Sequence, residues 1–207
     1  MARQYVQQLR AENAQDTRRR ILDAVATRLR EAPTQPISLD KVAAQARVAR
    51  STIYLVFGSR AGLFEAFAED LGDRTGVAAL RAANEAPDPR NKLRGALAAG
   101  NLMYERDRAI YRVLFSMRQL DPESIGGAMQ LNERNRAEGV AWLAGLLGAA
   151  GHLRPGLSVD DAARILFVLT GFEAFDALYT DRGLPVEAVT ALILAMAERS
   201  VLRENGG

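Results

Sequence analysis

The sequence of 207 residues contains no cysteine and only one histidine, His152. The missing cysteines exclude disulfides, thiolate zinc sites, iron–sulfur clusters and cysteine nucleophiles. A single histidine excludes the two-histidine zinc motif and leaves one candidate for a Ser-His-Asp arrangement. The composition is typical of a cytoplasmic protein that is not a hydrolase of the common kinds. We therefore predict no catalytic residues, no metal site and no cofactor, and we expect that the chain is not an enzyme.

Long apolar runs are missing as well. The longest apolar stretches, residues 165–170 and 188–197, are far shorter than the roughly 20 residues of a membrane-spanning helix. The polar residues 1–10 lack the apolar core of an export signal. With 48% hydrophobic and 25% charged residues, the chain can bury a core, and extended disorder is excluded. We expect one or two folded domains and no membrane partner.

Charge is distributed unevenly along the chain. Residues 1–60 hold 11 Lys and Arg against 5 Asp and Glu, a balance of +6, whereas residues 61–207 carry a balance of −4. A basic first third on an acidic body is expected where a protein contacts a polyanion such as nucleic acid. A solvated basic face with a basic tail would explain the same charges.

Cap and turn signals divide the chain into about nine helices, and no long stretch alternates with period two. Asp16 or Thr17 is expected to cap the first helix, Ser38 the second and Ser59 the fourth. The sequence therefore predicts an all-α fold. Its helices are expected over residues 17–29, 38–46, 49–57, 60–71, 89–104, 107–117, 122–150, 159–179 and 186–203.

The most informative segment is residues 38–57, where two short helices meet at a tight connection in a helix-turn-helix spacing. Apolar residues suited to lock the two helices together are Val42, Ala43, Val48, Ile53 and Phe57. In the second helix, Ser51 and Leu55 point away from the apolar side. Such a polar outer face can enter a DNA major groove. An ordinary helical hairpin with a solvent-exposed polar face would have the same pattern.

Residues 17–71 contain TRRRILDAVATRL and then SLDKVAAQARVARSTIYLVFGSRAGLFEAFAEDL, and this region resembles the DNA-binding region of the TetR (tetracycline-repressor) family of bacterial transcriptional regulators. The strong resemblance covers about a quarter of the chain. It implies a three-helix DNA-binding head over residues 16–62 and a larger helical ligand-binding and dimerisation domain over residues 63–207. It also implies a homodimer on double-stranded palindromic DNA and release of that operator by a small-molecule effector.

The resemblance assigns DNA contacts to two groups of residues. Base edges would be faced by Arg50, Ser51, Thr52 and Leu55, and phosphates would be contacted by Ser38, Lys41, Tyr54 and Arg60. Arg60 stands where the family usually has lysine, and its planar guanidinium can make the same phosphate contact.

Three positions depart from the family pattern. Arg47 occupies a turn position usually given to glycine, where a left-handed backbone costs another residue roughly 1 kcal/mol. Ala49 replaces the usual serine cap of the recognition helix, a loss of about 1 kcal/mol of helix support. Leu55 takes a commonly polar groove-facing place and can offer only apolar contact, for instance to a thymine methyl group.

The last two expected helices are apolar nearly all round, which is typical of helices buried on two sides. The resemblance makes them the dimer interface, a four-helix bundle with contacts from Leu169, Phe172, Leu192 and Met196. Without the resemblance, a core within one chain is the simpler interpretation.

A ligand cavity would be mostly apolar with a few polar groups. Candidate lining residues on the middle and later helices are Asn101, Met103, Tyr104, Phe115, Trp142, Phe167, Thr170 and Glu173. Large side chains at helical spacing equally form an ordinary core. The leading interpretation is a homodimeric, ligand-responsive repressor. The alternatives are a helical ligand-binding or interaction module with a weakened DNA-binding head and, disfavoured by the composition, a helical enzyme.

Overall fold

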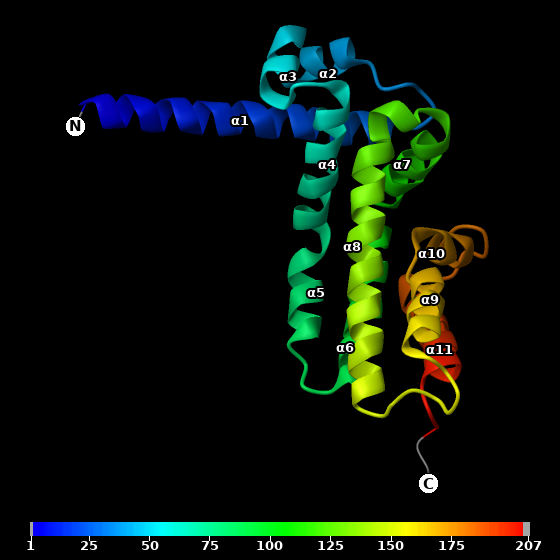
Figure 1. Cartoon of the computed structure of the whole chain (residues 1–207). Coiled ribbons are helices and arrows are strands. Elements are labelled where there is room, and N and C mark those ends of the chain that lie inside the picture. Colours follow the sequence, from blue (N-terminus) through cyan, green and yellow to red (C-terminus); the bar gives the residue numbers. More distant parts are fainter. Residues whose placement is uncertain (1, 205–207) are drawn as a thin grey trace. The chain divides into compact units, whose positions relative to one another are not determined.

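The structure, a computed structural model, describes residues 2–204, with the backbone alone for residues 2–6, 8, 10, 73, 75 and 77 (Figure 1). Over this range the chain forms eleven α-helices and an isolated antiparallel bridge between Leu153 and Leu202, which confirms the all-α prediction. The helices are α1 (Ala2–Glu31), α2 (Leu39–Ala46), α3 (Arg50–Phe57), α4 (Arg60–Thr75), α5 (Val77–Asn84), α6 (Pro89–Arg106), α7 (Arg108–Leu120), α8 (Pro122–Ala149), α9 (Val159–Leu169), α10 (Phe172–Tyr179) and α11 (Val186–Val201).

The chain packs into two compact units. Unit 1 runs to Leu71 and includes the segment Ala109–Gln130, and unit 2 consists of Gly72–Arg108 and the chain from Leu131 onward. Helices α4, α7 and α8 each pass from one unit into the other. The division into domains at residues 16–62 and 63–207 stays a prediction, because the units describe packing and not independent folding.

The expected start of the first helix at Asp16 or Thr17 is wrong, since α1 already begins at Ala2. No proline or glycine interrupts residues 2–16, so the helix has no reason to stop there. The Asp16 carboxylate does not cap a helix end. It pairs along the helix with Arg19 at 2.8 Å and Arg20 at 3.2 Å.

Two helices account for the difference between the nine expected and the eleven found. The expected helix over residues 159–179 is broken at Thr170 and Gly171, where Gly171 precedes α10 in an extended conformation. The Thr170 hydroxyl donates a hydrogen bond to the Leu166 carbonyl at 2.8 Å. Helix α5 was not expected, because Gly76 precedes it without a capping side chain.

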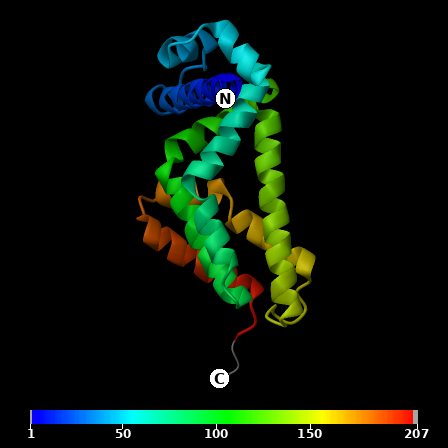
Figure 2. The same cartoon turned by 90° about the vertical axis from the view of Figure 1, so that its left-hand side faces the viewer.

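The core of unit 1 is built around one face of α1. Ile21, Val25 and Leu29 of this helix are fully buried, spaced one turn apart as the sequence predicted. Helices α2 and α3 lie side by side across the carboxy-terminal half of α1 (Figures 1 and 2), and the first turns of α4 complete the core with Leu63 and Phe64. Packing against α1 therefore holds the helix-turn-helix in place.

The core of unit 2 is apolar with a few paired polar groups. Helices α6, α9 and α11 bury Leu93, Leu166 and Ile193 completely or nearly so. The buried Asn101 amide donates a hydrogen bond to the Thr190 hydroxyl at 3.1 Å, which joins α6 to α11. A buried amide without such a partner would cost free energy, so this pair fixes the register of the two helices.

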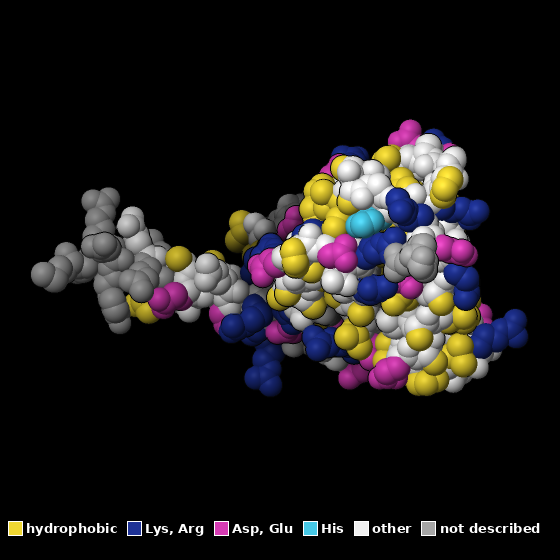
Figure 3. All heavy atoms as spheres, turned by 90° about the horizontal axis from the view of Figure 1, so that it is seen from below, with side chains coloured by type: hydrophobic (Ala, Val, Ile, Leu, Met, Phe, Trp, Pro, Cys, Tyr) yellow, Lys and Arg dark blue, Asp and Glu magenta, His cyan; other side chains and the backbone are white. Residues whose placement is uncertain are grey.

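No helix among the described residues is long and apolar enough to cross a membrane. On the face seen in Figure 3, acidic, basic and apolar side chains are interspersed.

Two glycines of α6 provide a matched test of the packing between α5 and α6. A Cβ atom at Gly100 meets no atom within 4 Å, so Gly100→Ala is expected to stabilise the helix and raise the free energy of unfolding by up to about 1 kcal/mol. A Cβ atom at Gly95 would lie 2.8 Å from the Cβ of Ala83 on α5. Since neither atom can rotate away, Gly95→Ala is expected to destabilise the chain by roughly 1–3 kcal/mol.

Chemical denaturation followed by circular dichroism measures both variants. Equal stabilisation by the two substitutions would mean that α5 does not approach α6 at Gly95.

Candidate nucleic-acid interface

Helices α2 and α3 form a helix-turn-helix whose connection is only three residues long. The backbone N–H of Val48 donates to the Ala43 carbonyl at 3.0 Å, and that of Arg47 donates to the Ala44 carbonyl at 3.2 Å. These bonds satisfy the carbonyls at the end of α2, as in other helix termini that close through a left-handed residue. Val42 and Ile53, one from each helix, are completely buried. The turn and the buried pair together fix which side of α3 faces outward.

Arg47 adopts the left-handed backbone that the turn requires, with φ 55° and ψ 48°. It is the one residue other than glycine with positive φ among residues 2–204. The departure from glycine thus leaves the turn geometry intact, at a cost of roughly 1 kcal/mol.

Ala49 precedes α3 in an extended conformation and provides no side-chain hydrogen bond to the first turn, as expected from its sequence. Gly58 ends the helix with φ 74°. The recognition helix is therefore uncapped at its amino end, and it depends on packing through Ile53 more than a capped helix would.

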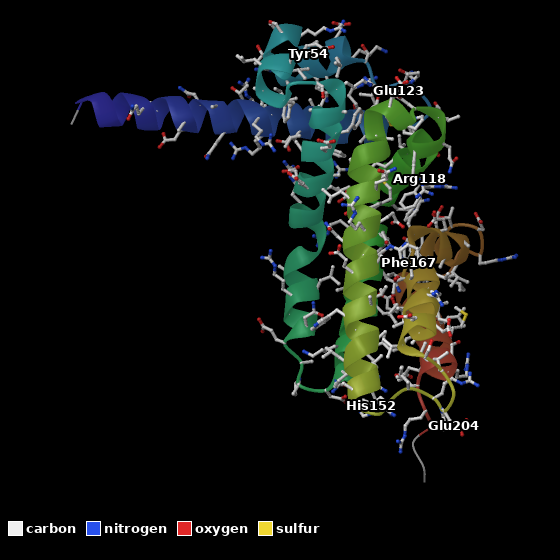
Figure 4. All side chains as sticks on the ribbon, in the orientation of Figure 1. Tyr54, Arg118, Glu123, His152, Phe167 and Glu204 are labelled. Atoms are coloured by element: carbon white, nitrogen blue, oxygen red, sulfur yellow. The ribbon has the colours of Figure 1, made fainter. Side chains whose placement is uncertain are left out.

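The outer face of α3 presents the residues that the sequence predicted. Arg50, Ser51 and Tyr54 are exposed, Thr52 is half-buried, and Leu55 is 86% exposed (Figure 4 marks Tyr54). A leucine this exposed on a short helix gains nothing from the fold of its own unit. The face therefore combines hydrogen-bonding groups with one apolar side chain suited to a thymine methyl.

Arg50 is held by two neighbours on this face. Its guanidinium lies 3.1 Å from an Asp40 carboxylate oxygen and donates to the Tyr54 hydroxyl at 3.4 Å. The hydrogen bond with Tyr54 and the charge of Asp40 raise the pKa of Arg50, whose guanidinium, like that of any arginine, is always charged. The guanidinium is thereby positioned at the amino end of α3, from which helix-turn-helix proteins contact bases.

The two remaining candidates on α2 lie at its amino terminus. The Ser38 hydroxyl accepts a hydrogen bond from the Lys41 backbone N–H at 3.5 Å, so Ser38 caps α2 as predicted. The exposed Lys41 side chain donates to the Gln35 side chain at 3.3 Å.

Arg60 differs from the other candidates because its guanidinium is occupied by groups of unit 1. Its Nε donates to the Ser124 hydroxyl at 2.7 Å, and Nη1 donates to the Ile37 carbonyl at 2.7 Å. Its Nη2 pairs with the Asp121 carboxylate at 3.3 Å. A phosphate contact by Arg60 stays a prediction, and it would have to share these donors.

Sequence reasoning missed Asp40, Asp121 and Ser124 as parts of this region. Asp40 could have been found, because an acidic residue in the first turn of α2 lies close to the amino end of α3 in a helix-turn-helix. Asp121 and Ser124 could not, because they follow Arg60 by more than 60 residues and carry no motif.

The predicted ligand-contacting residues are not gathered into one place. Phe115 lies in unit 1, beneath the Arg118 guanidinium, and Trp142 is exposed on α8 beside Lys92. Glu173 is exposed, and Met103 is half-buried next to Gly76. A ligand contact by any of these residues stays a prediction.

Tyr104, Phe167 and Thr170 do come together in unit 2, at the break between α9 and α10. The Tyr104 hydroxyl donates to the Thr170 carbonyl at 3.2 Å, and its ring meets that of Phe172 edge-on. Arg136 of α8 lies with its guanidinium 3.7 Å from the centre of the Phe167 ring and donates to the Thr170 hydroxyl at 3.2 Å. The positive charge of Arg136 near the last carbonyls of α9 also interacts favourably with the negative end of the helix dipole.

The predicted interface residues on α9–α11 divide into two groups. Leu192 is exposed, and Leu169 and Met196 are half-buried along a groove between α9 and α11. Phe172 is buried within its own unit against Tyr104. The groove is lined by Arg164, Ile165, Val168, Leu169, Met196, Arg199 and Ser200.

The described residues hold no cluster of three or more metal-ligating side chains.

Residues 21–67 match the model of the family described as bacterial regulatory proteins, tetR family. Among curated proteins no match is found.

Solved structures of similar fold extend the comparison to most of the chain. A TetR-like transcriptional regulator from Rhodococcus sp. RHA1 is 26% identical, with 88% of this chain and 94% of that chain covered and a TM-score of 0.64. NalD of Pseudomonas aeruginosa, the secondary repressor of the MexAB-OprM multidrug efflux pump, is 22% identical, with 94% and 100% covered and a TM-score of 0.70. The ketosteroid transcriptional regulator KstR2 of Mycobacterium tuberculosis is 18% identical, with 90% and 95% covered and a TM-score of 0.62.

The matched region contains the whole helix-turn-helix, and the helices that follow it share the fold of these regulators. The chain thus carries the helix-turn-helix of the tetR family of bacterial regulatory proteins over residues 21–67, and it is similar in fold to DNA-binding transcriptional regulators of that family.

Proposed function

We propose that the chain is a repressor that binds a palindromic operator as a homodimer and releases it when a small molecule binds. The observation that carries this proposal is the outer face of α3, where an 86% exposed leucine lies among hydrogen-bonding side chains. Exposed apolar and polar groups on one short helix face fit a major groove, which offers both methyl groups and polar base edges.

In this proposal α3 lies in the major groove. Arg50, Ser51 and Leu55 contact base edges, with a smaller part for the half-buried Thr52. Ser38, Lys41 and Tyr54 contact phosphates, and the +6 balance of residues 1–60 adds attraction that does not depend on sequence.

The homodimer would form through the groove between α9 and α11. Val168 is 67% exposed and Leu192 is 39% exposed, and the groove beside them is apolar between Arg164 and Arg199. A second copy of the chain is the partner that fits, because a two-fold axis would pair the same face with itself and would place two heads on a palindrome. Phe172 is left out of this interface, since its ring is buried in its own unit.

The effector site would lie in unit 2 near Tyr104, Phe167 and Thr170. This region joins large rings to polar groups, which is the composition of small-molecule sites. Among the proteins of similar fold, NalD is a repressor of a multidrug efflux pump and KstR2 is a ketosteroid transcriptional regulator, and both names favour a small-molecule effector for this chain. Asn101, Met103, Trp142 and Glu173, and Phe115 of unit 1, are weaker candidates.

A helical ligand-binding or interaction module with a weakened DNA-binding head is the second candidate. It is favoured by the uncapped Ala49 and the strained Arg47. A mobility assay decides between the two, because the second candidate predicts only weak binding with no preference for any duplex sequence.

Substitution of a residue proposed to contact phosphates should affect DNA binding differently from substitution of a residue proposed to contact bases. Lys41→Ala is expected to weaken binding to all duplexes alike and to reduce the slope of log affinity against log salt by about one. Ser51→Ala is expected to change the preferred sequence of a duplex selected from a random pool, since base contacts specify and phosphate contacts position. Each variant is measured on the selected site and on unrelated DNA.

Tyr54 and Arg50 are less suitable for this comparison, because their side chains are hydrogen-bonded to each other. If Lys41→Ala changed the base preference while general affinity stayed the same, the assigned roles would be wrong.

The dimer is tested by Val168→Glu combined with Leu192→Glu. A buried unpaired carboxylate costs several kcal/mol, so this variant should sediment as a monomer while its helical content persists. Operator binding should be lost, because one head holds only one half-site.

Leu102→Glu is the matched control, since Leu102 is an exposed leucine of α6 in the same unit. A double variant that remains dimeric and folded would place the interface elsewhere.

A further inference from the structure

Arg60 joins the start of α4 to the turn between α7 and α8. All three nitrogens of its guanidinium donate hydrogen bonds, to the Ser124 hydroxyl, the Ile37 carbonyl and the Asp121 carboxylate. The guanidinium also lies 5.2 Å from the centre of the Phe64 ring. All five residues belong to unit 1, so this cluster is internal to one compact body.

The cluster lies among residues proposed to contact the DNA backbone. Arg60 follows α3 with only Gly58 and Ser59 between them. Ile37, whose carbonyl accepts from Arg60, immediately precedes Ser38, the cap of α2. Arg60 therefore supports the amino end of α2 while it remains close to the phosphates that α2 and α3 would contact.

Its three partners are not equivalent. Ser124 is buried, and the Ile37 carbonyl belongs to the backbone, so both stay in place. The side chain of Asp121 is 39% exposed and that of Arg60 is 29% exposed, so their ion pair is partly accessible to solvent. Asp121 alone carries a negative charge and can be replaced on the guanidinium by another anion.

We propose that Asp121 competes with a DNA phosphate for Arg60 and so limits the affinity of this regulator for the DNA backbone. The inference rests on the proposed function. It assigns a role in DNA binding to the α7–α8 turn, which is outside the helix-turn-helix. Arg60 would keep its bonds to Ser124 and Ile37 on DNA and exchange only the Asp121 carboxylate for a phosphate oxygen.

Asp121→Asn in the full chain tests the competition, because it removes the charge and keeps the shape of the side chain. With a duplex of arbitrary sequence, affinity at low salt should rise by roughly tenfold, the worth of one charge-assisted hydrogen bond. The slope of log affinity against log salt should steepen by about one, because the wild-type Asp121 carboxylate takes up a cation when a phosphate displaces it from Arg60 and Asn does not. Both changes should disappear when Arg60→Gln is combined with Asp121→Asn.

Glu123→Gln is the matched control, since Glu123 is exposed on the same turn (Figure 4) and carries the same charge. Glu123→Gln removes only long-range repulsion between the carboxylate and DNA. Any increase in DNA affinity that it causes should therefore be the same in the wild-type and Arg60→Gln backgrounds. Asp121→Ser is the second variant: it removes the carboxylate while keeping a residue that can cap α8, and it should behave like Asp121→Asn. Circular dichroism checks that each variant folds.

The proposed competition would be wrong if Asp121→Asn still raised the DNA affinity in the Arg60→Gln background. It would also be wrong if both Asp121 variants bound DNA more weakly than the wild type. In those cases the wild-type chain still binds DNA and the proposed function stands. If neither the wild type nor any Asp121 variant retards a duplex at low salt, the proposed function and this inference both fail.

Discussion

Burial of Ile53 is the constraint on which the arrangement of the DNA-binding head depends. Helix α3 has only eight residues and no capping side chain, so it has little helical stability of its own. Complete burial of Ile53 anchors α3 in the core of unit 1 and leaves one orientation for the rest of the helix. Residues two positions away along the helix then lie on its opposite side, which explains why Ser51 and Leu55 are exposed, whereas Thr52, one position away, is half-buried.

Around this anchor, charged side chains hold one another in defined places. Arg50 is held by Asp40 and Tyr54, and Arg60 is held by Asp121, Ser124 and a backbone carbonyl. The first arrangement is solvent-exposed, so it contributes little to stability and serves mainly to orient a guanidinium. The second is partly buried, so it holds the Arg60 guanidinium more firmly. Arg50 and Arg60 are therefore held in place to different degrees.

Unit 2 follows another principle, in which polar pairs set the geometry of apolar helices. Asn101 and Thr190 fix α6 against α11, and Tyr104 and Arg136 hold the break between α9 and α10 at Thr170. Buried polar groups without partners are costly, so such pairs specify one packing among several that apolar residues alone would allow. The same break turns Phe172 inward, and the apolar face that remains outside lies on α9 and α11.

Local patterns determined much of this protein, because their physical causes lie within a few residues. Helical periodicity, the Ser38 cap, the left-handed turn at Arg47 and the outward face of α3 all depend on neighbours along the chain, and sequence reasoning found them. Sequence reasoning failed at two helix boundaries that no local residue marks. Helix α1 begins well before Asp16, because no residue there interrupts it, and the chain breaks between α9 and α10 at Gly171 without a proline. Only the tertiary structure decided that Phe172 is core, that Phe115 belongs to unit 1, and that Arg60 meets Asp121. Those contacts join residues distant in sequence, and the packing of whole helices brings them together.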